Sequence, residues 1–143
     1  MSNSPLGDLD SVVSVLRRHY CGDGGFLDSL RPYGGSLDRQ AMAAIRDAVL
    51  EGVKIVEGGE GRVPWELVSL MVRLPQTVRR WAIDPGSQLE RNRLILEEDR
   101  EFLRGWVVEI EDAGLRVLGI LEDAERRKRQ EGTRNGGTGS DSP

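Results

Sequence analysis

A chain of 143 residues is long enough for one domain with a single hydrophobic core. No apolar run approaches the roughly 20 residues that cross a bilayer, and the opening residues MSNSPLGDLD lack the pattern of a secretory signal, so we expect neither a membrane segment nor a leader. The formal net charge of -4, with acids and bases interspersed, gives no overall attraction to nucleic acid or to acidic lipid.

The scarcity of cysteine and histidine limits the chemistry that the chain can perform. Cys21 is the single cysteine, so an internal disulfide is impossible and the reducing cytoplasm is the expected compartment. His19 is the single histidine and lies on the apolar side of a predicted helix, where packing is its usual role; we expect no metal and no cofactor. The glycine clusters lack the ending of a P-loop and no catalytic triad can be singled out, so we expect no enzyme. Nearly all basic residues are arginine, which indicates a GC-rich bacterial genome.

The first predicted helix covers residues 8–20, after an N-terminus of residues 1–7 that we expect to be disordered. Asp8 can cap this helix, and the basic residues near its end suit the negative C-terminal pole. The next stretch is punctuated by glycine and proline and leaves room for one helical turn over residues 26–30. The amphipathic pattern of the first helix requires a partner for its apolar side.

The second predicted helix begins after Ser36, which can serve as its cap, and ends at the glycine pair that starts with Gly58. Its apolar face is thin because it contains several alanines and Gly52. Another helix can therefore approach this face closely.

Two prolines divide the next apolar segment. Pro64 stands where a helix prefers proline, at its first position, whereas Pro75 lacks an amide donor within the run that follows. We therefore expect two short helices over residues 64–74 and 75–83. The sequence Asp-Pro-Gly at residues 84–86 predicts a turn.

A long helix is predicted over residues 88–130, after a capping box that begins at Ser87. Part of it, residues 105–123, also alternates like a strand with a turn at residues 112–114, but a hairpin would expose several apolar residues that one helical face collects. An apolar stripe repeats every seven residues, at Leu89, Leu96, Leu103, Ile110, Val117 and Ala124. We expect the tail of residues 131–143, which has no apolar residue to bury, to be disordered.

The predicted fold is therefore all-α, with several short helices packed on one long amphipathic C-terminal helix in a single domain of residues 8–130. The seven-residue stripe fits either a contact with another chain or packing on the domain's own core. Its partner positions are too irregular for a regular two-stranded coiled coil, which favours packing within the chain. Asp99 falls inside the stripe, and we favour an exposed position beyond the core over a charge pair with Arg46, Arg79 or Arg80.

The far side of the same helix carries a candidate interaction face, formed by Gly105, Val108, Leu115 and Gly119. Small and apolar residues at positions that should face solvent permit close approach of another helix. We interpret this face as a contact between two copies of the chain.

Residues 66–84 invite comparison with helix-turn-helix DNA readers. The second helix would direct Gln76, Thr77, Arg79 and Arg80 toward a groove. The predicted turn lacks the usual glycine and the surrounding charge is acidic, so two short core helices with exposed arginines are favoured.

The sequence thus favours a non-enzymatic cytoplasmic protein that acts through protein–protein association, as an adaptor, antagonist or assembly factor, with a protein partner or a second copy. The alternative is a DNA-binding regulator that uses residues 66–84. We expect no interaction with membranes.

Overall fold

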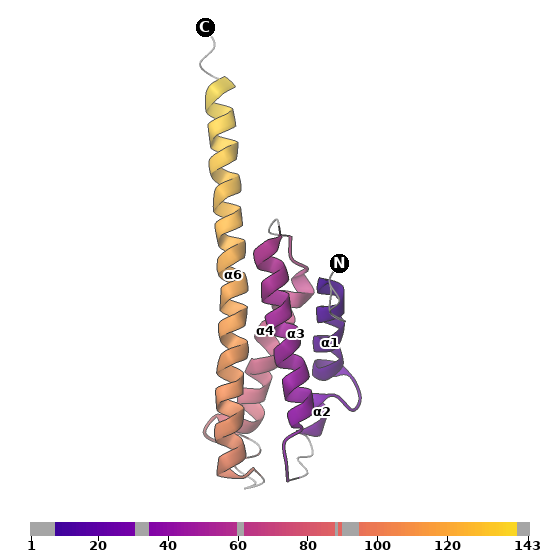
Figure 1. The fold of residues 1–143 in the computed structure, drawn as a ribbon. Helices are drawn as coiled ribbons and strands as arrows, with labels where there is room; N and C mark the ends of the chain where they lie inside the picture. The colour runs from indigo at the N-terminus through magenta and orange to yellow at the C-terminus, as the bar shows by residue number, and fades with distance from the viewer. Residues whose placement is uncertain (1–7, 31–34, 60–61, 88, 90–94, 140–143) are drawn as a thin grey trace.

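The computed structural model describes residues 8–30, 35–59, 62–87, 89 and 95–139, with only the backbone described over 134–139. Every element of secondary structure within these ranges is helical, as predicted. Three helices stand side by side against a fourth, which forms one edge of the bundle and projects well beyond it (Figure 1). The elements are α1 (Leu9–Cys21), α2 (Phe26–Ser29), α3 (Arg39–Gly58), α4 (Trp65–Val78), the π-helical turn η1 (Arg79–Ile83) and α6 (Glu97–Gly139).

The first two helices follow the sequence prediction closely. The Asp8 carboxylate caps α1 by accepting a hydrogen bond from the Ser11 amide at 2.8 Å. The apolar side of α1 is buried, and α2 is the single turn expected after it. Phe26 in α2 is fully buried, with its ring centroid 5.2 Å from that of Trp106 in α6, so this short turn closes one end of the core.

The cap of α3 is Asp38, two residues later than the predicted Ser36. The Asp38 carboxylate accepts a hydrogen bond from the Ala41 amide at 3.0 Å. Leu37 is buried just before the helix, so the chain packs this side chain on the core before it turns. The thin face of α3 allows another helix to approach closely, as predicted. A β-carbon added to Gly52 would stand only 3.2 Å from Val12 Cγ1 of α1.

Pro75 does not end a helix, so the prediction of separate helices over residues 64–74 and 75–83 is wrong. The α4 helix continues through Pro75 to Val78 and widens into η1, which closes with a hydrogen bond from the Asp84 amide to the Arg79 carbonyl at 2.8 Å. A proline inside a helix costs about 3 kcal/mol. Burial of Leu74, Pro75 and Val78 offsets that cost. The turn predicted at residues 84–86 is present, with Gly86 at a φ of 77°.

The long helix is shifted toward the C-terminus relative to its prediction of residues 88–130. It begins at Glu97, because Ile95 and Leu96 are not helical, and it runs to Gly139 without a break at any glycine, which excludes the hairpin. Residues 131–139, predicted within a disordered tail, are helical. Of the predicted capping box, Ser87 is buried and residues 88 and 90 lie outside the described residues, as do the predicted ends 1–7 and 140–143.

The central part of the seven-residue stripe packs on the domain's own core. Leu103, Ile110 and Val117 are buried, whereas Leu96 before them is exposed. Trp106 is buried beside them and donates a hydrogen bond from Nε1 to the Met42 carbonyl of α3 at 2.9 Å. This inner side of α6 therefore contacts both α3 and α4. Among the described residues, no helix has the length and apolar character needed to cross a membrane.

Candidate interaction surface

Packing of α6 on the core fixes which of its residues face outward. Gly105, Val108 and Leu115 are exposed and Gly119 is half-buried. The exposed fractions are 42% for Val108 and 66% for Leu115, high values for aliphatic side chains. A β-carbon added to Gly105 or Gly119 would meet no atom within 4 Å. We call these four residues the outward face of α6; within the described structure it lies opposite the core, where the sequence pattern put it.

Ion pairs with α3 help to fix the rotation of α6. Glu109 pairs with Arg46 of α3 at 2.5 Å, and Arg116 pairs with Glu57 near the end of α3, also at 2.5 Å. These contacts flank the inner side of the helix, so they stabilise the orientation that exposes Val108. Each pair is largely exposed and contributes little energy alone.

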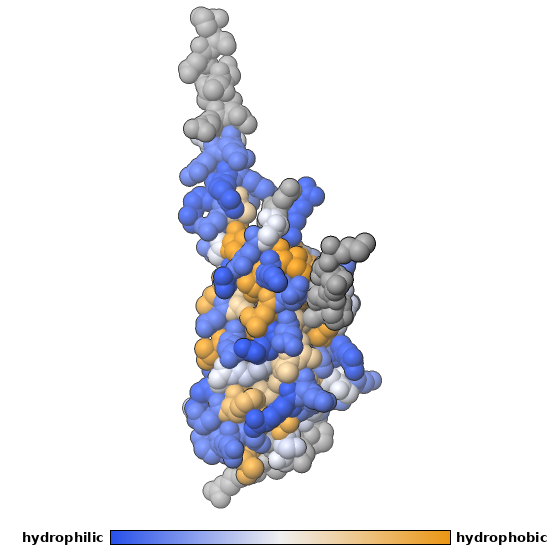
Figure 2. All heavy atoms as spheres, in the orientation of Figure 1, coloured by the Kyte–Doolittle hydropathy of each residue, from blue (hydrophilic) through white to orange (hydrophobic). Residues whose placement is uncertain are grey.

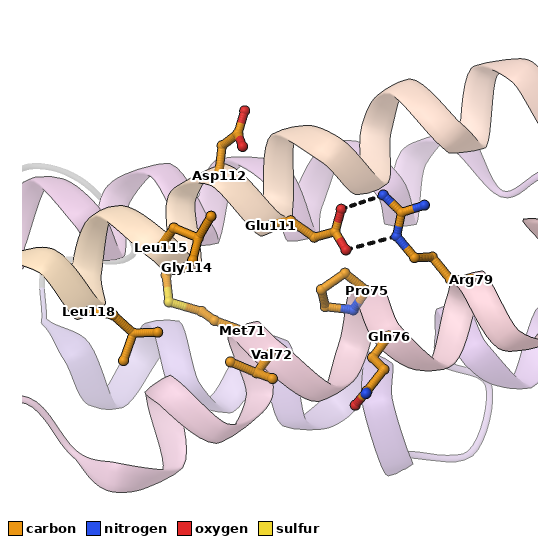
Figure 3. Close-up of a pocket in the computed structure, with 10 residues that line it drawn as sticks. All are labelled: Met71, Val72, Pro75, Gln76, Arg79, Glu111, Asp112, Gly114, Leu115 and Leu118. Atoms are coloured by element: carbon orange, nitrogen blue, oxygen red, sulfur yellow. Dashed lines mark hydrogen bonds and ion pairs between the residues drawn. The ribbon is translucent and has the colours of Figure 1, made fainter.

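A groove of about 550 Å³ runs between α4 and α6 beside the outward face (Figure 3). Apolar side chains from both helices line it, including Val72, which is 46% exposed, and Leu118. At its floor α6 approaches α4 at Gly114, where an added β-carbon would stand 3.7 Å from the Met71 carbonyl oxygen. In a regular helix the amide of residue 75 would donate to the Met71 carbonyl, but Pro75 has no amide hydrogen. The carbonyl that Pro75 leaves without this hydrogen bond is therefore the one that Gly114 approaches.

The apolar surface extends along α4. Trp65 is 80% exposed and lies seven residues before Val72, hence on the same side of the helix. The sequence pattern singles out neither residue, because both fall within segments expected to be core helices. The sequence feature that could have identified them is the width of the apolar pattern of α4. This helix buries seven residues on one side and still carries Trp65 and Val72 on another side.

The four residues proposed to contact DNA do not form one free surface. Gln76 and Arg80 are exposed and Thr77 is half-buried. Arg79 instead holds Glu111 of α6 with two hydrogen bonds, of 2.8 Å from Nε and 2.5 Å from Nη2 (Figure 3). The Glu111 carboxylate raises the pKa of Arg79, so the guanidinium stays charged and paired. The turn of a helix-turn-helix is also absent from residues 66–83, because α4 continues directly into η1.

A second groove, of about 470 Å³, lies between α3 and α6. The Arg39 guanidinium lies 3.9 Å above the centroid of the Phe102 ring and 3.8 Å from Asp99. Asp99 is only 14% exposed, so the expectation that it lies in solvent is wrong. The sequence could not identify Arg39 as its partner, because the two residues are 60 positions apart.

The single histidine and the single cysteine have local partners. His19 Nδ1 accepts a hydrogen bond from the Phe26 amide at 3.2 Å, and burial, reinforced by Arg18, lowers the pKa of the imidazole against the opposing effect of Asp38. The Cys21 thiol donates to the Arg17 carbonyl at 3.3 Å. No three histidine, cysteine or carboxylate side chains within the described ranges are grouped so that they could hold a metal ion.

Comparison of the chain with protein-family models, with curated proteins and with solved structures found no match.

Proposed function

We propose that this chain is a non-enzymatic cytoplasmic protein that acts through protein–protein association. Its contact surface consists of the outward face of α6 and the adjoining groove between α4 and α6. The observation that carries the proposal is the exposure of Val108 and Leu115 on a helix whose opposite side is already packed. Exposed apolar residues that cluster on one side of a protein mark contact surfaces more often than residues scattered singly.

The arrangement of neighbouring apolar residues supports this assignment. Among the seven large hydrophobic residues that are exposed in the described structure, four belong to α4 or to the outward face of α6, and two of these, Val72 and Leu115, line the groove between the helices. Hydrophobic residues gather over the bundle, whereas the projecting part of α6 carries hydrophilic ones (Figure 2). A partner that covers the bundle portion removes apolar area from water, and the polar projection extends past it. The four residues are Trp65, Val72, Val108 and Leu115.

Binding of DNA through Gln76, Thr77, Arg79 and Arg80 has less support. Contact with a phosphate or a base edge would require Arg79 to break its ion pair with Glu111 of α6. The net charge of -4 also opposes approach to a polyanion. No observation favours this alternative over protein association.

The proposal is tested by affinity capture from the native host, followed by mass spectrometry, together with light scattering of the purified chain. We expect a stoichiometric partner, either another protein or a second copy, that is lost in the Leu115→Glu variant. Leu50→Glu is the matched control, because Leu50 is an exposed leucine on α3, outside the proposed surface. A chain that is monomeric and captures no stoichiometric protein would contradict the proposal.

A further inference from the structure

The outward face of α6 continues at both ends with charged residues at the same alternating spacing of three and four positions. Toward the N-terminus the next positions are Glu101 and Glu98, and toward the C-terminus the series reaches Arg126 and Arg129. All four are exposed. We call the complete series the outer seam: it consists of the outward face, these four charged residues, Asp112 and Glu122.

The charges at the two ends of the outer seam have opposite signs. The midpoint of the seam lies between Ala113 and Gly114, with Glu98 and Glu101 at one end and Arg126 and Arg129 at the other, while Asp112 and Glu122 lie between these end pairs. If a second α6 lies alongside in the opposite direction, each acidic end meets a basic end. If it lies in the same direction, glutamate meets glutamate and arginine meets arginine.

From this charge complementarity we propose that the partner is a second copy of the chain, bound antiparallel through the outer seam. The proposal rests on the proposed function and names the occupant of the same surface. Glu98 lies opposite Arg129 of the second copy, and Glu101 lies opposite Arg126 of the second copy. In this register Val108 lies opposite Gly119 of the second copy, so an apolar side chain packs where a glycine leaves room.

The position of α6 at the edge of the bundle makes the arrangement sterically feasible. The core lies on the opposite side of α6, so the two bundles stand on the outside of the helix pair (Figure 1). Beyond Leu121, which still packs against the core, the helix passes the bundle and projects. Arg126 and Arg129 lie on this projection, where a second chain can cover them with a packed surface. The antiparallel helix dipoles add a favourable contribution.

Existing ion pairs do not compete strongly with this association. Glu101 pairs with Arg104, Arg126 pairs with Asp123 at 3.6 Å, and Arg129 pairs with Glu125 at 3.8 Å; each pair lies within about one turn of α6 and is exposed to solvent. Such pairs contribute little and exchange readily for pairs across an interface.

Asp112 lies at the centre of the seam and points away from α4 (Figure 3). In the antiparallel register Asp112 lies opposite Leu115 of the second copy, and Glu122 lies opposite Gly105 of the second copy. Because these two acids limit the apolar area and have no basic partner across the seam, we expect a reversible dimer that dissociates on dilution and at high salt.

Charge exchange tests both the dimer and its direction. Sedimentation equilibrium at low salt should give twice the chain mass of 15.9 kDa for the wild type. The double variant Arg126→Glu/Arg129→Glu should be monomeric, and adding Glu98→Arg/Glu101→Arg to it should restore the dimer. The matched control is Arg127→Glu/Lys128→Glu, which makes the same charge change in the same basic run but off the seam, and should remain dimeric.

Cross-linking tests the register independently. In a Cys21→Ser background, the single variants Glu101→Cys and Arg126→Cys should form a disulfide when mixed under oxidation and should not cross-link when oxidised alone. Self-linking of Glu101→Cys would overturn the antiparallel direction. Replacement of the exposed Cys21 removes the one competing thiol.

The outcomes separate this inference from the proposed function. A monomeric wild type that still captures another protein through Leu115 would overturn the dimer and leave the function standing. A dimer that both double variants weaken equally would overturn the seam as its interface. A dimer lost only in Arg126→Glu/Arg129→Glu and restored by the fourfold exchange supports the inference.

Discussion

The inner and outer sides of α6 carry apolar residues at similar helical spacing but have opposite environments. Leu103 and Ile110 on the inner side are buried against α3 and α4, whereas Val108 and Leu115 on the outer side are exposed. The comparison shows that a seven-residue repeat identifies a helical face without identifying what covers it. The outer series is distinguished by its charged ends, with Glu98 and Glu101 at one end and Arg126 and Arg129 at the other.

The largest expected difference in the free energy of unfolding is between variants of two tryptophans, one buried and one exposed. Trp106→Ala should lower the free energy of unfolding by about 3–5 kcal/mol, because it leaves a cavity between α2, α3 and α6 and removes the hydrogen bond to the Met42 carbonyl. Trp65→Ala should change it by less than about 0.5 kcal/mol, since Trp65 is exposed on α4. Urea denaturation followed by circular dichroism measures both; equal losses would contradict the division into a packed and an open side.

The glycines of α6 give the next test. Gly105→Ala and Gly119→Ala should each raise the free energy of unfolding by about 1 kcal/mol, because alanine favours the helix and its methyl group meets no atom within 4 Å. Measurement in a Leu115→Glu background removes any contribution from association.

Gly52→Ala is the control for these glycines. Its methyl group would press on Val12 Cγ1 at 3.2 Å, so the gain in helix propensity should be cancelled or reversed. A similar gain at all three positions would show that the approach of α1 to α3 is looser than described.

A smaller effect is expected from the ion pair that links α4 to α6. Arg79→Ala should lower the free energy of unfolding by less than about 1 kcal/mol, because Arg79 and Glu111 are 31% and 35% exposed. Arg80→Ala, an exposed neighbour, should have less effect still. Thermal unfolding of the two variants side by side measures the difference, and a larger loss for Arg80→Ala would contradict the pairing.

The smallest expected effect on folding is at Leu115. Leu115→Gln should change the free energy of unfolding by no more than about 0.5 kcal/mol, because the side chain is 66% exposed. The measurement is chemical denaturation at a protein concentration low enough to keep the chain monomeric. A loss as large as that of a buried leucine would place Leu115 in the core and remove it from the contact surface.

The sequence predicted the parts of the fold that local physics determines. Asp8 caps α1 because a carboxylate before an apolar helical pattern satisfies free amides, and Ile110 lies at the centre of the packed side of α6 because the helical period puts it there. The outward positions of Val108 and Leu115 followed from the same period.

Errors occurred where tertiary contacts oppose a local signal. Pro75 was expected to end a helix, but burial of its neighbours outweighs the lost hydrogen bond. Asp99 was expected in solvent, and Arg79 was expected in solvent or at a DNA groove. Asp99 instead pairs with Arg39, and Arg79 pairs with Glu111, each far away in sequence. Spacing along one chain does not encode such pairs. The groove between α4 and α6 was missed for the same reason, because it needs residues from two helices.

The projecting part of α6 also has a hydrodynamic consequence. From Leu121, the last apolar residue that packs against the core, to Gly139 the helix extends roughly 27 Å, at about 1.5 Å per residue. A single chain of this shape experiences more friction than a sphere of equal mass, so it elutes early from a sizing column. Antiparallel pairing lays each projection along the other body, so the friction per unit mass should fall as the mass doubles.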